Sequence, residues 1–249
     1  MSVPAAPVAR TLAQAAVELR LTARRGENVL VTVIIPAVVL VFFASVDLLP
    51  VSAGPPVGFL LPGSLALAVI ATSLVNLGIS TAYERSYGVL KRLGGSPLTR
   101  ANLVAAKIAA ILALELLQVV LLVTIASLVL GWSPPQGTAP ALVAVTLLLG
   151  TLAFAGLGLL LAGALRAETT LALGNALFLV ALLLGGIILP VDHLPGPLAA
   201  VAPWLPAAAL SDAFRAALGS GGEVLRPVAV LTGWGIASVA ITVRTFRWE

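Results

Sequence analysis

Six apolar stretches, each long enough to cross a lipid bilayer as a helix, constrain this chain more than any other feature. A spanning helix needs about 20 largely apolar residues. Hydrophobic residues make up 60% of the 249 residues and charged residues only 10%, too few to cover a water-facing surface. The runs are continuous rather than alternating, which excludes barrel strands. The sequence therefore predicts an all-α membrane protein that forms a single domain over 1–249, with six spans at about 28–47, 59–82, 103–131, 139–165, 169–190 and 226–243.

The composition also excludes several classes of function. The chain has no cysteine, which removes disulfides and thiolate chemistry, and its single histidine, His193, cannot build an imidazole metal cluster. Neither of its two lysines, Lys91 and Lys107, follows a glycine, so the chain lacks a phosphate-binding loop of the GxxxxGK type. We therefore expect no catalytic residue, no metal site and no cofactor in this chain. If ATP is used, another chain must bind it.

The distribution of basic residues predicts the orientation of the spans. Cytoplasmic loops of membrane proteins carry an excess of lysine and arginine. With both termini in the cytoplasm, twelve of the fourteen basic residues lie inside, and only Arg215 and Arg226 lie outside. The net charge of +4 then reflects topology and attraction to anionic lipids, not nucleic-acid binding. We expect a multi-pass protein of the plasma (inner) membrane with both termini cytoplasmic.

An amphipathic helix is predicted before the first span, at residues 8–25. Its apolar stripe consists of Val8, Leu12, Ala15 and Leu19, whereas Arg10, Gln14 and Arg24 lie off the stripe. Such a helix lies flat in the membrane interface, with its apolar face in the lipid and its arginines toward lipid phosphates. It is either a passive anchor or a docking element for a partner.

The loop between the second and third spans, Tyr83–Arg100, is the most unusual cytoplasmic feature. Glu84–Leu93 can form a short charged helix with an apolar edge, which Gly94 and Gly95 end before Ser96 and Pro97 turn the chain back. A helix this short gains little stability from propensity alone, so we expect something to pack on it. The alternative is a solvated loop whose charges only set the topology.

The segment 190–225 contains too many prolines for a span but is largely apolar. Two short helical pieces are predicted, at about 198–204 and 207–218. Irregular backbone at membrane depth is tolerated only against protein or a water-filled cavity. We therefore expect a re-entrant helical hairpin in the outer leaflet before the last span, with a loop resting on the headgroups as the alternative.

Polar side chains inside the spans are candidates for function. Glu115 lies in the third span, with Gln118 one turn further on the same face. Glu115 either contacts a substrate cation or a proton, or is hydrogen-bonded between helices. Lys107, two turns earlier, is expected to extend its ammonium toward the cytoplasmic interface.

Two asparagines, Asn76 and Asn175, are further candidates for a substrate path, although helix packing is the more common role of such residues. Gly158 and Ala162 form a pair of small residues that allows close helix approach. The chain shows no paired carboxylates and no nucleophile with a neighbouring base, so none of these residues suggests an enzyme.

Along its whole length the sequence resembles the ABC-2-type permeases, the membrane subunits of ATP-binding-cassette exporters. The most specific segment is ERSYGVLKRLGGSP at 84–97, close to the E-x-x-x-G-x-L-x-x-L-x-x-S-P pattern of that family. FLLPGSLALAV at 59–69, LPVDHLPGPL at 189–198 and SDAFRAAL at 211–218 also fit. The terminal RTFRWE looks like the tail of drug-resistance permeases of the daunorubicin type.

This resemblance implies a specific function. Similar permeases form dimers, and two copies of a separate ATPase, which holds ATP and Mg²⁺, dock on a cytoplasmic coupling helix; the turn at Leu165–Thr169 would be a second, smaller contact. The coupling residues carried over by the resemblance are Glu84, Arg85, Gly88, Leu90, Leu93, Ser96 and Pro97. The expected substrate is hydrophobic or amphipathic, drug-like or lipid-like, and the second permease is either another copy of this chain or a paralogue.

Two other functions remain open from the residues alone. The first is a stand-alone secondary transporter or channel that uses Glu115, although one acidic residue and no detectable inverted repeat support it weakly. The second is a membrane scaffold or assembly factor that transports nothing.

Overall fold

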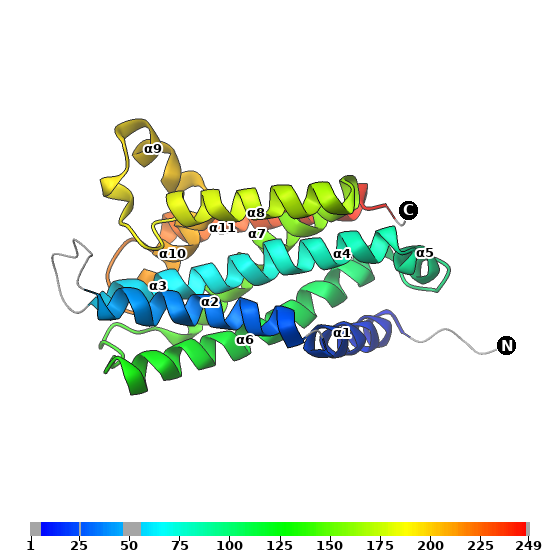
Figure 1. Cartoon of the computed structure of the whole chain (residues 1–249). Coiled ribbons are helices and arrows are strands. Elements are labelled where there is room, and N and C mark those ends of the chain that lie inside the picture. Colours follow the sequence, from blue (N-terminus) through cyan, green and yellow to red (C-terminus); the bar gives the residue numbers. More distant parts are fainter. Residues whose placement is uncertain (1–5, 25, 47–55, 248–249) are drawn as a thin grey trace.

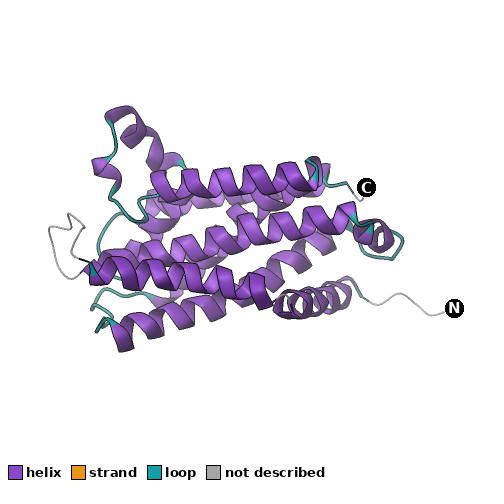
Figure 2. Cartoon of the chain, viewed as in Figure 1, coloured by secondary structure: helices purple, strands orange, loops and turns teal. Residues whose placement is uncertain are grey.

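The computed structural model describes residues 6–24, 26–46 and 56–247, and every regular element among them is helical (Figures 1 and 2). Short 3₁₀ turns lie at Val191–His193 (η2) and Ala202–Trp204 (η3), and a π-helical segment, η1, lies at Ile70–Asn76. The α-helices are α1 Pro7–Arg24, α2 Gly26–Ser45, α3 Pro56–Val69, α4 Leu77–Ser86, α5 Val89–Gly94, α6 Arg100–Val129, α7 Pro140–Ala164, α8 Ala167–Leu184, α9 Gly196–Val201, α10 Pro206–Ala217 and α11 Leu225–Thr245.

Five helices are long and apolar enough to cross a membrane: Pro56–Ser86, Arg100–Val129, Pro140–Ala164, Ala167–Leu184 and Leu225–Thr245. They confirm five of the six predicted spans. The first predicted span, 28–47, falls on α2, of which Thr32–Ser45 is a shorter apolar helix, and residue 47 lies outside the described residues. The sixth crossing therefore stays a prediction.

The span predicted at 169–190 is too long. Its helix, α8, ends at Leu184, because Gly185 caps it and Gly186 takes a left-handed conformation with φ of 61°. The apolar residues that follow, from Ile187 onward, leave the helix and enter the connection to α9 and α10.

The second span lies at the centre of the bundle and carries a feature that the sequence did not predict. Here α3, η1 and α4 form one continuous helix, Pro56–Ser86, that is largely buried. The π-helical segment in its middle shifts the faces of α3 and α4 relative to each other. Thr72 and Ser73 are fully buried on η1.

Close packing against this central helix depends on a glycine of α7. A Cβ atom built on Gly158 would lie 2.8 Å from the carbonyl oxygen of Ser73 and 2.7 Å from that of Leu74. Only glycine allows this approach, because such distances are shorter than any real Cβ contact. The prediction that Gly158 permits close helix approach is confirmed, and Ala162, one turn further, is fully buried against Ala82 and Ala167.

The amphipathic helix α1 is present, but its polar side faces protein. It packs on α6 at the end of the bundle that also holds α5 and the end of α11 (Figure 1). Val8 and Leu12 are 70% and 63% exposed, as expected for a lipid-facing stripe. Arg10, in contrast, turns inward and hydrogen-bonds within the protein, as does Gln14, so the expectation that the arginines point to lipid phosphates is wrong for Arg10.

The segment 190–225 does form short helices, but its two halves differ. η2 and α9 project from the opposite end of the bundle, and α9 is largely exposed (Figure 1). α10 is buried against α3, α7 and α11. Phe214 is fully buried on this helix, and the Ser211 hydroxyl donates to the Gly185 carbonyl oxygen. Only α10 is therefore an integral part of the helix bundle.

Candidate functional site

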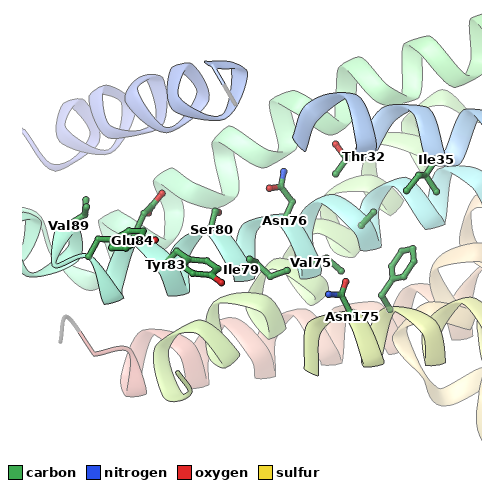
Figure 3. A pocket seen from close by; sticks show the side chains of 13 residues that line it. Thr32, Ile35, Val75, Asn76, Ile79, Ser80, Tyr83, Glu84, Val89 and Asn175 are labelled. Carbon is green, nitrogen blue, oxygen red and sulfur yellow. The ribbon is translucent and has the colours of Figure 1, made fainter. Parts of the chain in front are cut away.

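A cavity of about 620 Å³ lies between α2, the η1–α4 segment and α8 (Figure 3). Its walls are mostly apolar and include Ile35, Val75 and Phe178. It brings together Asn76 and Asn175, which are 99 positions apart in the sequence and face the cavity from different helices. Two of the four predicted substrate-path residues thus line one cavity.

The two asparagine side chains differ in their hydrogen bonds. The Asn175 side chain donates to the Leu171 carbonyl oxygen of its own helix at 3.0 Å. Within the described residues, the Asn76 side chain makes no hydrogen bond, although it is partly buried. An amide without a protein partner beside an apolar cavity can donate to and accept from a ligand.

Glu84, Tyr83 and Tyr87 line the α5 end of the same cavity. The two tyrosine rings stack with centroids 6.0 Å apart, and Tyr87 is 75% exposed. Val89, the first residue of α5, also lines the cavity. The cavity therefore reaches the segment 84–97.

A buried cluster of three charged residues lies behind Glu84. The Lys107 ammonium on α6 is 2.7 Å from the Glu84 carboxylate and 2.9 Å from the Glu18 carboxylate on α1. Lys107 is only 1% exposed, so the expectation that it extends to the interface is wrong. Two carboxylates satisfy the charge inside the protein, and Gln14 donates to Glu18 at 2.8 Å.

The neighbouring residue, Arg85, points to another helix. Its guanidinium donates to the Gly163 carbonyl oxygen at 2.7 Å and also to that of Leu165, at the end of α7. These carbonyls have no partner within the helix, and a cation there also interacts favourably with the helix dipole. Arg85 therefore joins the end of α4 to the α7–α8 turn.

The short charged helix predicted over Glu84–Leu93 is divided in two. α4 continues through Glu84 and Arg85 to Ser86, and α5 begins only at Val89, because Gly88 between them has a left-handed φ of 71°. α5 then ends at Gly94, as expected. The segment is a helix end, a sharp turn and a six-residue helix.

α5 packs on its own chain. Leu90 is fully buried against Leu103 of α6 and Phe246, and Leu93 packs beside them. Ser96 donates to the Leu93 carbonyl oxygen at 2.6 Å, and the Pro97 carbonyl accepts from Arg10 of α1. The apolar edge of α5 is thus covered within the protein, and its charged residues Lys91 and Arg92 are exposed.

Glu115 is fully buried and joins three helices. The Ser73 hydroxyl of η1 donates to one carboxyl oxygen, and the Thr151 hydroxyl of α7 lies within hydrogen-bonding distance of the other. Glu115 is not among the residues that line the cavity. These hydrogen bonds between helices agree with one of the two roles expected for Glu115, and a contact with a substrate cation or a proton stays a prediction.

Gln118 makes a second link of this kind. Its amide nitrogen donates to the Thr72 hydroxyl at 3.0 Å and to the Thr32 carbonyl oxygen of α2 at 3.3 Å. The hydroxyls of η1 were missed by the sequence analysis, because serine and threonine are frequent in spans. Thr72 and Ser73 face α6, while the neighbouring Ala71 and Val75 face the cavity.

Two further cavities, of about 360 and 420 Å³, flank Arg215 of α10 at the α9 end of the bundle. The guanidinium carbon lies 4.3 Å from the centre of the Phe59 ring, and a nitrogen lies 2.7 Å from the Asp212 carboxylate. Burial lowers the pKa of Arg215, and its ion pair with Asp212 opposes that shift. Leu61 and Leu65, fully buried on α3, lie between Phe59 and the first cavity.

The chain matches a known protein family over most of its length. No curated protein matches the chain. The family model described as "ABC-2 type transporter" matches residues 11–218, most of the chain, including the charged cluster, the segment 84–97 and α10. This multi-pass membrane protein therefore belongs to the ABC-2 type transporter family and is a permease membrane domain.

Proposed function

We propose that this protein is the membrane subunit of an ATP-driven exporter that moves a hydrophobic or amphipathic, drug-like or lipid-like substrate out of the cytoplasm or the inner leaflet. The observation that carries the proposal is the 620 Å³ cavity that begins beside η1 and ends at the segment 84–97. A ligand in this cavity would lie directly beside the part of the chain that meets the ATPase.

The lining of the cavity supports this class of substrate. Ligand sites are typically apolar with a few polar groups that fix orientation. Here Ile35, Val75, Ile79 and Phe178 supply the apolar wall, and the Asn76 amide is available for a polar group of the substrate. Polar side chains also line the cavity, but they contribute less of its surface than the apolar groups, which favours an amphipathic substrate over a sugar chain.

Membership of the family implies a partner ATPase subunit. We place its docking surface, one for each of two ATPase copies, on α5 and the turns around it, with ATP and Mg²⁺ held in the ATPase. Tyr87, Lys91 and Arg92 are exposed there, while Gly88 and Leu90 hold α5 in place. In this arrangement Glu84 and Arg85 transmit motion rather than contact the ATPase.

The proposed topology has six spans, with α2 as the first, and both termini in the cytoplasm of the plasma (inner) membrane. The start of α1, α5 and the end of α11 lie at one end of the bundle, in agreement with this orientation (Figure 1). The α9–α10 segment then forms the outer hairpin. A second copy of this chain completes the transporter. If a paralogous permease copurifies with the chain instead, the transporter is a heterodimer of permeases.

The first test is purification of the chain in mild detergent with its ATPase, followed by reconstitution. We expect ATP-dependent transport of a fluorescent amphipathic dye or a labelled phospholipid. Asn76→Leu and Asn175→Leu should raise the KM for the transported probe, by about three- to tenfold for Asn76, the equivalent of one hydrogen bond. Thr124→Val, exposed on α6 away from the cavity, is the matched control.

Unchanged transport in both asparagine variants would show that the cavity is not the substrate path. A stand-alone transporter that uses Glu115 makes a different prediction. The purified chain would carry a proton-coupled flux without any ATPase, and Glu115→Gln would abolish that flux. Flux by the purified chain alone that depends on Glu115 would overturn our proposal. Binding of the ATPase without any flux would favour a scaffold instead.

A further inference from the structure

We propose that the cavity of about 360 Å³ beside Arg215 binds the anionic headgroup, a phosphate or a carboxylate, of a lipid. The cavity lies at the α9 end of the bundle, between the start of α3, the connection from α6 to α7 and the end of α10. This inference goes beyond the proposed function, because binding of a lipid here needs neither the ATPase nor transport.

The charges at this end of the bundle are divided unequally between two cavities. Within the described part of the chain, Arg215 is the one charged residue that lines the 360 Å³ cavity. Asp192, Asp212 and Glu223 line the neighbouring cavity of about 420 Å³ instead, and Arg215 also lines that one. An anion in the smaller cavity would therefore meet a cation in a wall that carries no carboxylate among the described residues.

The guanidinium of Arg215 is held in place but is not saturated with acceptors. One nitrogen donates to the Asp212 carboxylate at 2.7 Å, and a second donates to the Gly186 carbonyl oxygen. The third, Nε, has no hydrogen-bond partner among the described residues, and the side chain is only 13% exposed. The Phe59 ring covers one face, with its centre 4.3 Å from the guanidinium carbon. Since a guanidinium has five N–H donors in one plane, this fork keeps donors for a phosphate or a carboxylate.

Two further donors line the cavity, the indole N–H of Trp132 and the hydroxyl of Ser133. Neither side chain makes a hydrogen bond to another residue that the structure describes. Ser220 lines the cavity as well, but its hydroxyl donates to the Gly58 carbonyl oxygen at 2.9 Å and so fastens the end of α10 to the start of α3. The cavity thus combines a buried cation with two unused donors, as an anion site requires.

The surroundings of the cavity indicate a lipid rather than a free anion. Phe59 and Leu130 form an apolar wall beside the donors. α6 leads up to Leu130, and its residues Leu117, Leu121 and Leu128 lie on one helix face and are exposed, Leu128 by 81%. An acyl chain can therefore lie along α6 while its headgroup enters the cavity.

Native mass spectrometry of the full chain in a neutral detergent tests the site. The probes are dioleoyl phosphatidylglycerol and dioleoylglycerol, which has the same acyl chains but no phosphate. We expect the chain to bind phosphatidylglycerol about tenfold more tightly than dioleoylglycerol, the equivalent of one charged hydrogen bond, and Arg215→Gln to remove this preference. Arg226→Gln, an exposed basic residue that lines the larger cavity but not the smaller one, is the matched control and should keep the preference.

A second variant keeps the test valid if Arg215→Gln disturbs α10. Trp132→Phe combined with Ser133→Ala removes two donors that no described residue uses, so the fold should be retained. The affinity for phosphatidylglycerol should fall by about three- to tenfold, while the affinity for dioleoylglycerol stays unchanged.

Three results would overturn the inference. The first is equal affinity of the wild-type chain for the two lipids, and the second is a preference for phosphatidylglycerol that survives in either variant. The third is inorganic phosphate that binds as tightly as phosphatidylglycerol, because the acyl chains would then contribute nothing and the site would take a free anion. Since no ATPase is present in this experiment, its failure leaves the proposed function to the transport assay.

Discussion

The carboxyl group of Glu115 is kept inside the bundle by hydroxyl partners rather than by a basic residue. Thr151 has one hydroxyl proton but lies near two acceptors, the Glu115 carboxyl and the Leu147 carbonyl oxygen, the latter at 2.7 Å. If Thr151 donates to Leu147, then Glu115 must donate to Thr151 as a neutral acid. Among the described residues, no basic side chain is hydrogen-bonded to or ion-paired with Glu115.

This geometry predicts that the charge of Glu115 is dispensable and its hydrogen bonds are not. Glu115→Gln should keep both bonds, accepting from Ser73 and donating to Thr151, and leave stability and transport near wild type. Glu115→Leu leaves the buried Ser73 hydroxyl without this acceptor, at about 1–3 kcal/mol for an unsatisfied group, while Thr151 can still donate to the Leu147 carbonyl oxygen. Thermal unfolding in detergent measures the difference, and a Gln variant as unstable as the Leu variant would contradict it.

At the scale of elements, the turn between α4 and α5 determines where α5 points. Its backbone requires a left-handed residue, which Gly88 supplies with φ of 71°. Arg85, just before the turn, is attached to the end of α7, and Leu90, just after it, is buried beside Phe246. The turn therefore lies between two fixed points, and α5 has little freedom to reorient.

Gly88→Ala should misplace α5, because an alanine in this conformation costs roughly 1–2 kcal/mol. We expect weaker binding of the ATPase, while the amount of protein in the membrane stays the same. Gly95→Ala is the matched control, since Gly95 has an ordinary φ of −78°. Affinity for the ATPase, measured with the protein in nanodiscs, checks this prediction, and equal affinities for both variants would refute it.

At the scale of the whole molecule, the cavities lie at opposite ends of the second span. Asn76 lines the cavity at the α5 end, and Phe59 lines both cavities at the α9 end. The side chains of α3 between them, Leu61 and Leu65 among them, are fully buried, and among the described residues none lines cavities at both ends. We therefore expect a barrier between the two ends of the second span.

Single cysteines should report this barrier. A membrane-impermeant thiol reagent should label Asn76→Cys only from the cytoplasmic side and Phe59→Cys only from the outside. Labelling of Asn76→Cys from outside is expected only when the ATPase is trapped with ATP. Because the wild-type chain has no cysteine, it is the background control. The reverse pattern in the resting state would contradict the proposed orientation.

The sequence by itself determined the class of the fold and most of its elements. Long apolar runs with few charges can satisfy their backbone hydrogen bonds in a bilayer only as helices, so five spans were predictable. The sequence also predicted α1, α5 and the short helices near 200 and 210. The pattern at 84–97 indicated the family, although Gly88 was not recognised as the point where the helix breaks.

Only the tertiary structure decided which side chains meet. A spanning helix that is hydrophobic all round carries little information about which face it turns inward. The rotation of each helix depends instead on close contacts such as that of Gly158 with η1. For this reason only the packed bundle shows three features: the pairing of Lys107 with Glu18 and Glu84, the π-helical segment, and the partners of Glu115.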